Sequence, residues 1–216
     1  MHSLKVNKCS LAEWAVLEMS EIRNKIREAV NSGFAPLLKS AGYRKNGFNF
    51  RQDVTPSVFR LVNVQCSQWD TQTKGEFTVN LGVYHSDLAA LHPMLPVTDS
   101  PLVKDCVVQE RLGFLMPRGK DFWWTIRPDS DAKALGTRVA AAWNKYGRPW
   151  LELNSSLPEA RKFLLGRNHF FLAAMASHAL GQKSETLRWL SKAIEDWPEG
   201  EERIEAWRRR HLGSRR

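Results

Sequence analysis

The chain has 216 residues, 43% of them hydrophobic and 25% charged, and it carries a formal net charge of +9. This composition is typical of a globular domain and excludes a disordered chain. No stretch reaches the about 18 apolar residues that a membrane span needs, and no apolar run follows the lysines near the N-terminus, so we expect neither a transmembrane helix nor a secretory signal.

The first part of the chain is predicted to be an extension followed by one long helix. Residues 1–18 have little pattern and are expected to pack as a short extra helix. Over residues 20–41 apolar side chains recur every three or four positions, which predicts an amphipathic helix. Gly33 and Pro36 should break or kink this helix, and Gly42 is suited to the position just after its C-terminus.

After this helix, apolar and polar side chains alternate along the sequence, which predicts antiparallel strands joined by turns. Thr55, Pro56 and Ser57 supply one turn and residues 70–75 another, and a loop with three prolines precedes the last strand. We expect four strands, at residues 47–53, 57–69, 76–85 and 106–115.

Helices return after the sheet. Asp131 and its neighbours offer caps for a helix over residues 131–146. Ser156 and Glu159 form a capping box that begins a helical region running to Trp207. Four residues in that region have the spacing of the second helix of a tetratricopeptide-like repeat: Gly181, Leu190, Ala193 and Pro198. One such hairpin cannot bury its own apolar face, so we expect it to dock on the sheet domain or on a second chain.

The segregation of strands from helices defines the expected fold class as α+β. We predict a four-stranded antiparallel sheet flanked by helices, with a C-terminal tetratricopeptide-like helical hairpin. The N-terminal extension takes residues 1–18, the sheet domain residues 19–153 and the helical appendage residues 154–216.

The chain carries no catalytic or metal-binding motif that we recognise. It has no Gly-rich phosphate loop, no G-x-S-x-G elbow and no H-E-x-x-H sequence, and its histidines have neither helical pairing nor a neighbouring cysteine at metal-ligand spacing. The widely spaced Cys9, Cys66 and Cys106 indicate reduced thiols and a cytoplasmic location. The last two lie in predicted strands, where a thiol is usually inert. We therefore expect no enzyme activity, no cofactor and no metal.

Polar residues inside the predicted strands are the candidates for a binding site. Asn63, Gln65 and Ser67 share one parity and should point to the same face of the sheet. A solvated sheet face would explain them without a ligand, whereas a binding face with arginine and aromatic residues at its rim would give them a function. The candidate binding residues are Arg51, Asn63, Gln65, Ser67, Trp69, Asn80, Tyr84, Arg111, Trp123 and Trp124.

The positive charge indicates an acidic partner, which could be a protein or a nucleic acid. The excess is spread along the chain, and the arginine cluster at residues 208–210 and 215–216 follows several glutamates, as at a solvated helix end. Sheets with aromatic side chains also bind RNA, but the chain lacks the Gly-aromatic signature of those domains and their order of strands and helices.

Several short motifs occur in the order in which one known family has them. They are Ser20 to Lys45, Phe48 to Arg51, Val62 to Ser67, Phe77 to Tyr84, Arg111 to Gly113, and Trp123 with Trp124. On these motifs, residues 20–153 resemble the bacterial domain-of-unknown-function 4304 family. The resemblance implies an α+β fold with an antiparallel sheet. It implies no activity, substrate or catalytic residue.

These observations favour a non-enzymatic intracellular protein that binds a macromolecule, with a protein as the expected partner. The most specific version is an immunity or antitoxin-like protein of a bacterial conflict system, by association with small bacterial α+β proteins that lack an active site. The alternative is a basic nucleic-acid-binding protein, whose affinity would fall steeply with salt. A hydrolase would require Asp53, Glu76, His85 or Glu110 to converge in one pocket.

Overall fold

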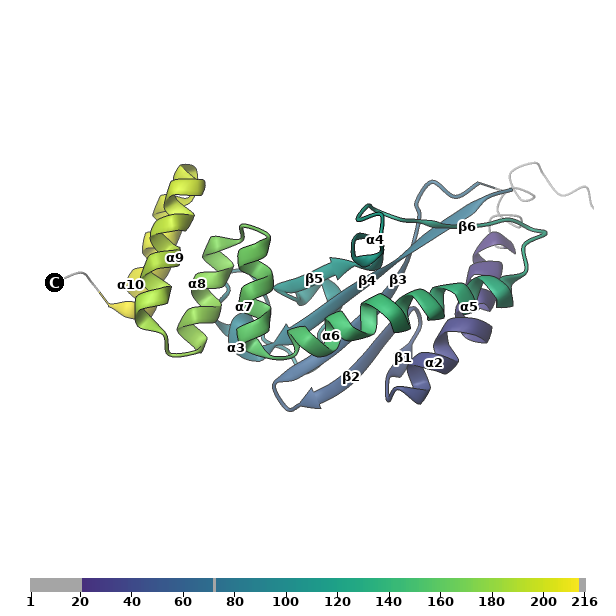
Figure 1. Cartoon of the computed structure of the whole chain (residues 1–216), viewed down its shortest axis with the longest axis horizontal. Coiled ribbons are helices and arrows are strands. Elements are labelled where there is room, and N and C mark those ends of the chain that lie inside the picture. Colours follow the sequence, from purple (N-terminus) through teal and green to yellow (C-terminus); the bar gives the residue numbers. More distant parts are fainter. Residues whose placement is uncertain (1–20, 72, 214–216) are drawn as a thin grey trace, which may run out of the picture.

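The structure is a computed structural model that describes residues 21–71 and 73–213 (Figure 1). It has an antiparallel sheet with helices packed on one face, in agreement with the α+β prediction. The predicted N-terminal extension, residues 1–18, lies outside the described residues. No helix within the described ranges is both long and apolar enough to cross a bilayer.

The sheet has six strands in the order β1-β2-β3-β4-β5, with β6 also paired to β4, and every pairing is antiparallel. The strands are β1 (Arg44–Asn46), β2 (Asn49–Thr55), β3 (Val58–Cys66), β4 (Gly75–His85), β5 (Val108–Arg111) and β6 (Trp124–Ile126). The predicted count of four strands is therefore wrong. β1 and β6 have three residues each, which is too short for an alternating pattern to be recognised.

The strand predicted at residues 106–115 is much shorter and belongs to an interrupted sheet edge. β5 pairs with residues 80–83 of β4, and β6 pairs with residues 75–77 of the same strand, on the same edge. Residues 112–123 leave the sheet between these two pairings and begin with the short helix α4 (Leu112–Leu115). The chain thus builds one sheet edge in two pieces and projects a loop from the gap.

Helices form a layer over the sheet and the whole C-terminal part of the chain (Figure 1). After a helical stretch over residues 21–29 they are η1 (Val30–Phe34), α2 (Ala35–Ser40), α3 (Ser86–Leu91), η2 (Val103–Asp105), α5 (Ala132–Ala142), η3 (Trp143–Gly147), α6 (Arg148–Asn154), α7 (Leu157–Gly166), α8 (Phe170–Ala179), α9 (Lys183–Asp196), η4 (Pro198–Gly200) and α10 (Glu201–Leu212). Asp131 caps α5 as predicted, by accepting a hydrogen bond from the Ala134 N–H at 2.9 Å. Ser156 lies at the N-cap of α7 but makes no side-chain capping bond, so the predicted capping box is not formed.

Two prolines inside helices are accommodated by π-helical turns. Residues 21–40 form one continuous helix in which η1 comes just before Pro36, and residues 132–154 form another in which η3 comes just before Pro149. A proline removes one backbone hydrogen bond from a helix, and a wider turn lets the helix continue past it. The predicted break at Gly33 and Pro36 is therefore a local change of helical turn.

The two long helices cross with their backbones in contact at Gly33 and Gly136. A Cβ atom on Gly136 would lie 2.0 Å from the carbonyl oxygen of Ala29, and a Cβ atom on Gly33 would lie 2.4 Å from the carbonyl carbon of Gly136. No side chain fits at either position, so glycine is required for this approach. The crossing lets both helices lie on the same face of the sheet.

That face of the sheet carries the main hydrophobic core. Phe50 of β2 and Val62 of β3 are almost fully buried beneath the helices. Phe34 and Tyr43 meet the Trp143 ring edge-on, with ring centroids 6.3 Å and 5.7 Å away. Aromatic pairs in this geometry contribute beyond the area they bury, so Trp143 joins the two long helices at the centre of the core.

The C-terminal helices continue the same core beyond the end of the sheet (Figure 1). Ala173 of α8 and Leu190 of α9 are buried between these two helices, which Gly181 separates as predicted. The indole N–H of Trp207 on α10 donates a hydrogen bond to the carbonyl oxygen of Leu91, at the end of α3, at 2.7 Å. The helical hairpin and α10 therefore pack against the part of the chain that bears the sheet.

We predict that Gly136→Ala destabilises the protein strongly. Its new methyl group has to push the two crossing helices apart, which costs about 3 kcal/mol of unfolding free energy, as overpacked cores do. Gly166→Ala is the matched control, because a Cβ at this exposed helical glycine meets no atom within 4 Å. The control should be neutral or stabilising by up to about 1 kcal/mol. Urea denaturation of the two variants checks this, and equal stabilities would contradict the crossing.

His85, at the end of β4, is buried against the C-terminus of α6. Its Nε2 lies 2.9 Å from the carbonyl oxygen of Asn154. Burial lowers the pKa of His85, and the hydrogen bond to Asn154 opposes this effect only in part. The folded protein thus holds the ring neutral, with Nε2–H as the donor.

We predict that the unfolding free energy falls as the pH is lowered from about 7.5 to about 5.5. Because the pKa of His85 is lower in the folded protein than in the unfolded chain, the unfolded chain takes up the proton first. This contribution is complete above the unfolded pKa and is lost as the pH falls below it. His85→Gln should reduce the fall, as measured by urea denaturation across this pH range, and a fall of the same size in this variant would contradict the assignment.

Candidate functional site

The face of the sheet away from the main core carries polar side chains at its centre. Paired residues of an antiparallel sheet point to the same side, so the strand register identifies the members of this face. Asn63 of β3 and Asn80 of β4 are paired and point to it, whereas the adjacent Val62 and Leu81 are buried in the main core. Each strand thus alternates between an apolar side and a polar side.

Five strands place polar residues in a single line across this face. We call this line the asparagine row; its Cα-paired members are Asn46, Asn49, Asn63, Asn80 and Arg111. With about 4.8 Å between neighbouring strands, the asparagine row is about 19 Å long. Four side-chain amides and one guanidinium are therefore offered in sequence from β1 to β5.

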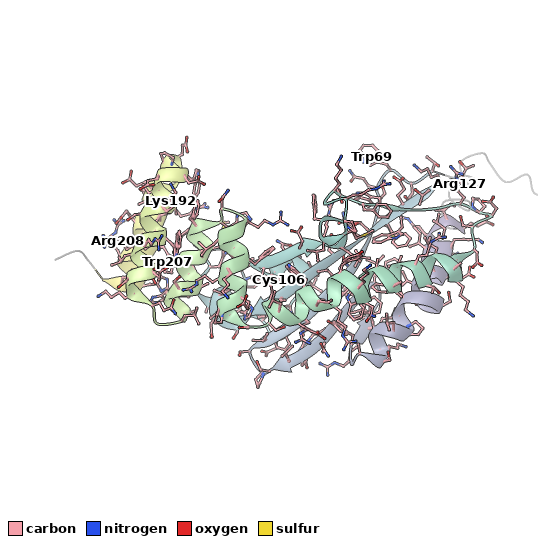
Figure 2. The ribbon with its side chains drawn as sticks, viewed as in Figure 1. Trp69, Cys106, Arg127, Lys192, Trp207 and Arg208 are labelled. Atoms are coloured by element: carbon pink, nitrogen blue, oxygen red, sulfur yellow. The ribbon has the colours of Figure 1, made fainter. Side chains whose placement is uncertain are left out.

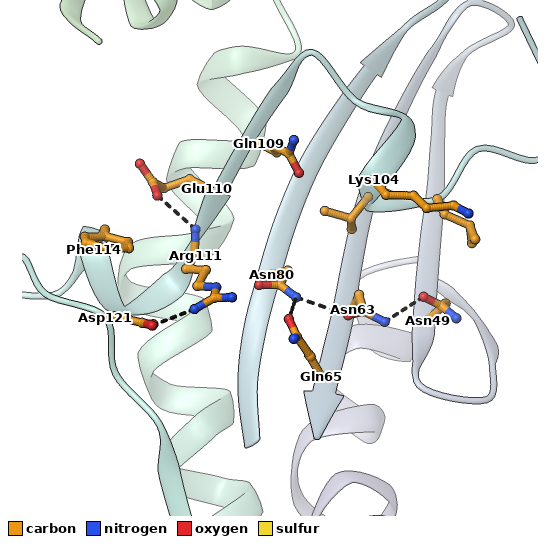
Figure 3. A pocket seen from close by; sticks show the side chains of 12 residues that line it. Asn49, Asn63, Gln65, Asn80, Lys104, Gln109, Glu110, Arg111, Phe114 and Asp121 are labelled. Carbon is orange, nitrogen blue, oxygen red and sulfur yellow. Dashed lines mark hydrogen bonds and ion pairs between the residues drawn. The ribbon is translucent and has the colours of Figure 1, made fainter. Parts of the chain in front are cut away.

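Most of the asparagine row lines the floor of a hollow of about 590 Å³ (Figure 3). The Asn63 amide donates to Oδ1 of Asn49 at 2.8 Å, and Nδ2 of Asn80 donates to Oδ1 of Asn63 at 3.2 Å. Nδ2 of Asn80 also donates to Oε1 of Gln65 at 2.9 Å. No residue in the described ranges accepts a hydrogen bond from the amide nitrogens of Asn49 and Gln65. These donors can therefore reach a ligand.

The loop that leaves the sheet after β5 holds Arg111 at one end of the hollow (Figure 3). Oδ2 of Asp121 accepts a hydrogen bond from the Arg111 guanidinium at 2.5 Å and another from the indole N–H of Trp123 at 3.1 Å. The same guanidinium lies 5.4 Å from the centre of the Trp123 ring. Asp121 and Trp123 thus fix the direction of Arg111, and most of its five N–H groups remain for other partners.

The opposite wall of the hollow is formed by η2, which lies directly on β4. A Cβ atom on Gly82 would be 2.8 Å from Sγ of Cys106 and 3.3 Å from Val103, so a glycine is needed beneath η2. Behind this wall a small second core contains Phe59 and Tyr84. The wall carries Leu102, which is 41% exposed, and the exposed Lys104 toward the hollow.

A smaller hollow of about 250 Å³ adjoins the first one. Asn49, Leu102 and Val103 line both hollows. The remaining walls of the smaller hollow come from β1, from neighbouring parts of β2 and β3, and from the loop residues just before Leu102. Together the two hollows follow the asparagine row from β5 to β1.

Arg51, in the smaller hollow, is held by the protein itself. Its guanidinium donates to Oδ1 of Asp53 at 2.7 Å and to the carbonyl oxygen of Asp99, and it lies 4.2 Å from the centre of the Phe59 ring. The hydrogen bond from Arg51, with a second from Arg44, lowers the pKa of Asp53. Arg51 thus ties the loop before η2 to the sheet and keeps the wall of the hollow in place.

The structure brings together only some of the residues that the sequence indicated. Asn63, Gln65, Asn80 and Arg111 line the larger hollow, Arg51 lines the smaller one, and Trp123 contacts Arg111. Ser67 and Trp69 follow the end of β3 and line neither hollow. Figure 2 shows Trp69, which is 80% exposed, at the edge of the molecule.

The expected placement of Tyr84 and Trp124 at the rim is wrong. Tyr84 is only 1% exposed, because its hydroxyl is bonded to Pro96 and Thr98 of the loop before η2. Trp124 is 6% exposed and stacks on Phe77 in the main core. Both rings hold loops or strands together and are unavailable to a partner.

Most of the residues that line the two hollows were not predicted, among them Asn46, Asn49, Lys104, Gln109, Phe114 and Asp121. Asn46 and Asn49 flank the β1–β2 turn, where polar residues are ordinary, so only the register reveals that they continue the row. Lys104 and Asp121 reach the site from outside the sheet, and no sequence pattern signals that approach.

The groups that a hydrolase would need do not converge in the structure. Asp53 is engaged by Arg44 of β1 and Arg51 of β2, and Glu110 pairs with Arg167. Glu76 and His85 lie at opposite ends of β4. Among the described residues, no three histidine, cysteine, aspartate or glutamate side chains are arranged to hold a metal ion.

The two cysteines in the described ranges are unpaired thiols. Burial raises the pKa of both Cys66 and Cys106, which disfavours the nucleophilic thiolate. Cys66 ends β3 as predicted, but Cys106 lies between η2 and β5 and not in a strand. Neither thiol lines either hollow.

The fold and the site define an α+β protein with a polar hollow on an open sheet face. The family described as "Domain of unknown function (DUF4304)" matches residues 34–153, which is more than half of the chain. The chain therefore belongs to this family, as its motifs indicated. Comparisons with curated proteins and with solved structures give no match.

We predict that Asp121→Ala loosens the loop over residues 112–123 without unfolding the protein. The substitution removes the acceptor shared by Arg111 and Trp123, both of which lie at the protein surface. Amide hydrogen exchange in this loop should become faster, while the strands keep their protection and the melting temperature falls by a few degrees at most, as expected for about 1 kcal/mol. Asp129→Ala, at an exposed position before α5, is the control, and unchanged exchange in Asp121→Ala would contradict the assigned role.

Proposed function

We propose that the protein acts by binding a protein partner on the open face of its sheet, without catalysis. The observation that carries this proposal is the asparagine row, with unsatisfied amide donors at the floor of a walled hollow. A merely solvated sheet face would need no walls, whereas this one is bounded by η2 and by the loop after β5. Side-chain amides offer both a donor and an acceptor, which suits them to main-chain and side-chain groups of another protein.

A protein partner is favoured over a nucleic acid by the position of the aromatic side chains. Proteins that bind single strands stack bases on exposed rings. On this sheet face Phe59 and Tyr84 are buried under the loop before η2, and Phe114 is the aromatic residue that lines the larger hollow. The face thus offers hydrogen bonds and charge but little stacking surface.

The specific form of the proposal is an immunity or antitoxin-like protein that neutralises a protein partner in the cytoplasm. The two unpaired thiols in the described ranges are in keeping with a cytoplasmic location. The association with small bacterial proteins of this kind is an argument by analogy. A toxin gene next to the gene for this protein would support it directly.

We also propose that the C-terminal hairpin of α8 and α9 is a tetratricopeptide-like unit with a structural role. The small Ala173 and Ala193 are buried where the two helices approach each other, and the hairpin shares the main core. Its part in the function is then to complete the fold, while the partner binds at the asparagine row.

We predict that Asn63→Val with Asn80→Val abolishes capture of the partner. The two substitutions remove the central amides of the asparagine row and keep strand propensity, so the fold should persist. The wild-type protein, expressed at its natural level in its native host and purified through a tag, should retain one partner in stoichiometric amount, and the double variant should lose it. Quantitative mass spectrometry of the two purifications makes the measurement.

Asn24→Val with Asn144→Val is the control for this experiment, since both asparagines lie on helices away from the hollows. It should retain the partner as the wild-type protein does. No stoichiometric partner for the wild-type protein, or equal retention by the two double variants, would sink the proposal.

A further inference from the structure

The two hollows along the asparagine row have an uneven balance of charge. Their lining includes five cationic residues: Arg44, Lys45, Arg51, Lys104 and Arg111. Lys45 pairs with the core residue Phe50, so its side chain points to the core face of the sheet. The other four cations stand against two carboxylates in the lining, Glu110 and Asp121, along a row about 19 Å long.

Both carboxylates in the lining are already neutralised by the protein. Asp121 accepts from Arg111 at 2.5 Å, and Glu110 pairs with Arg167 of the connection between α7 and α8. Oε1 of Glu110 also accepts the backbone N–H of Arg111 at 3.0 Å. Neither carboxylate is left to attract a cation, so the hollows do not favour a basic ligand.

Two parts of the lining lack a full set of internal counter-charges. Within the described residues no carboxylate pairs with Lys104, on the wall formed by η2. Arg44 and Arg51 share the single carboxylate of Asp53. An acidic ligand would supply the missing counter-charges.

The guanidinium of Arg111 is held in an orientation that suits a carboxylate ligand. Asp121 and Trp123 hold the guanidinium, and Figure 3 shows it pointing along the row toward Asn80. A guanidinium held in this way loses little side-chain entropy when it binds a carboxylate through two N–H groups. The amides of Asn49 and Gln65 then offer donors further along the same line.

We propose that the asparagine row binds an extended acidic segment of a protein partner, with one carboxylate on Arg111 and another near Lys104. This inference rests on the proposed function and names the chemistry of its partner. At about 3.3 Å per residue, the row has room for about six residues in extended conformation. The segment contributes carboxylates to the cations and main-chain carbonyl oxygens to the amide donors.

The test uses fluorescence anisotropy with a fluorescein-labelled glutamate oligomer of about ten residues, long enough to span the row. Oligo-deoxythymidylate and oligouridylate of the same charge form parallel arms. The wild-type protein should bind the glutamate oligomer saturably, and its affinity should fall as salt rises from about 50 to about 300 mM.

Lys104→Glu should weaken binding of the glutamate oligomer about tenfold, because attraction becomes repulsion at the wall of the larger hollow. Lys133→Glu makes the same change of net charge at an exposed position on α5, outside both hollows. This control should bind as the wild-type protein does, apart from a weak long-range effect that disappears in salt.

Three outcomes would overturn the inference: no saturable binding of the glutamate oligomer, equal loss in Lys104→Glu and Lys133→Glu, or tighter binding of either oligonucleotide. The last outcome would favour a nucleic-acid ligand. The partner capture described above separates this failure from that of the proposed function. If capture depends on Asn63 and Asn80 but survives Lys104→Glu, the partner is real and its acidic character is refuted.

Discussion

The packing of the helices on the sheet depends on the backbone contact between Gly33 and Gly136. This contact lets two long helices cross on one face of the sheet and bury a core centred on Trp143. Side chains at the crossing would separate the helices by several ångströms and leave unfilled space beneath them, which protein interiors do not tolerate. Because the helices are confined to one face, the other face is left for η2 and the loop after β5, and these two segments build the walls of the hollow.

The asparagine row exists because the strand register aligns residues that are far apart in the chain. Asn49, Asn63, Asn80 and Arg111 belong to four strands, and a slip of one residue in any strand would turn its member of the row toward the core. The apolar residues beside them, such as Val62 and Leu81, are buried and forbid that slip. The apolar core on one side of the sheet therefore fixes which polar side chains the other side presents.

Sequence patterns were sufficient where a local rule decides the outcome. Alternation located β2, β3 and β4 within a few residues, and Asp131 and Gly181 marked helix boundaries. The wrong predictions have a common cause: the contacts that determine the structure there join residues that are far apart in the sequence. Pro36 and Pro149 act through a widened turn, and Trp124 is buried by pairing with the start of β4. At the site, parity placed Asn63 and Gln65 on one face, but Lys104 and Asp121 depend on loops that only the folded chain brings near.

The interruption of the sheet edge between β5 and β6 has a consequence for how the family could diversify. Neither four-residue β5 nor three-residue β6 is long enough to template the strand of another molecule, and β5 also carries the charged Glu110 and Arg111, so the edge resists aggregation. The loop over residues 112–123 runs from β5 to β6, which both pair with β4, and β4 is anchored independently by β3. Insertions there would leave the register undisturbed. Members of the family could thus differ in the loop that forms one wall of the site and still keep the same polar row on the sheet.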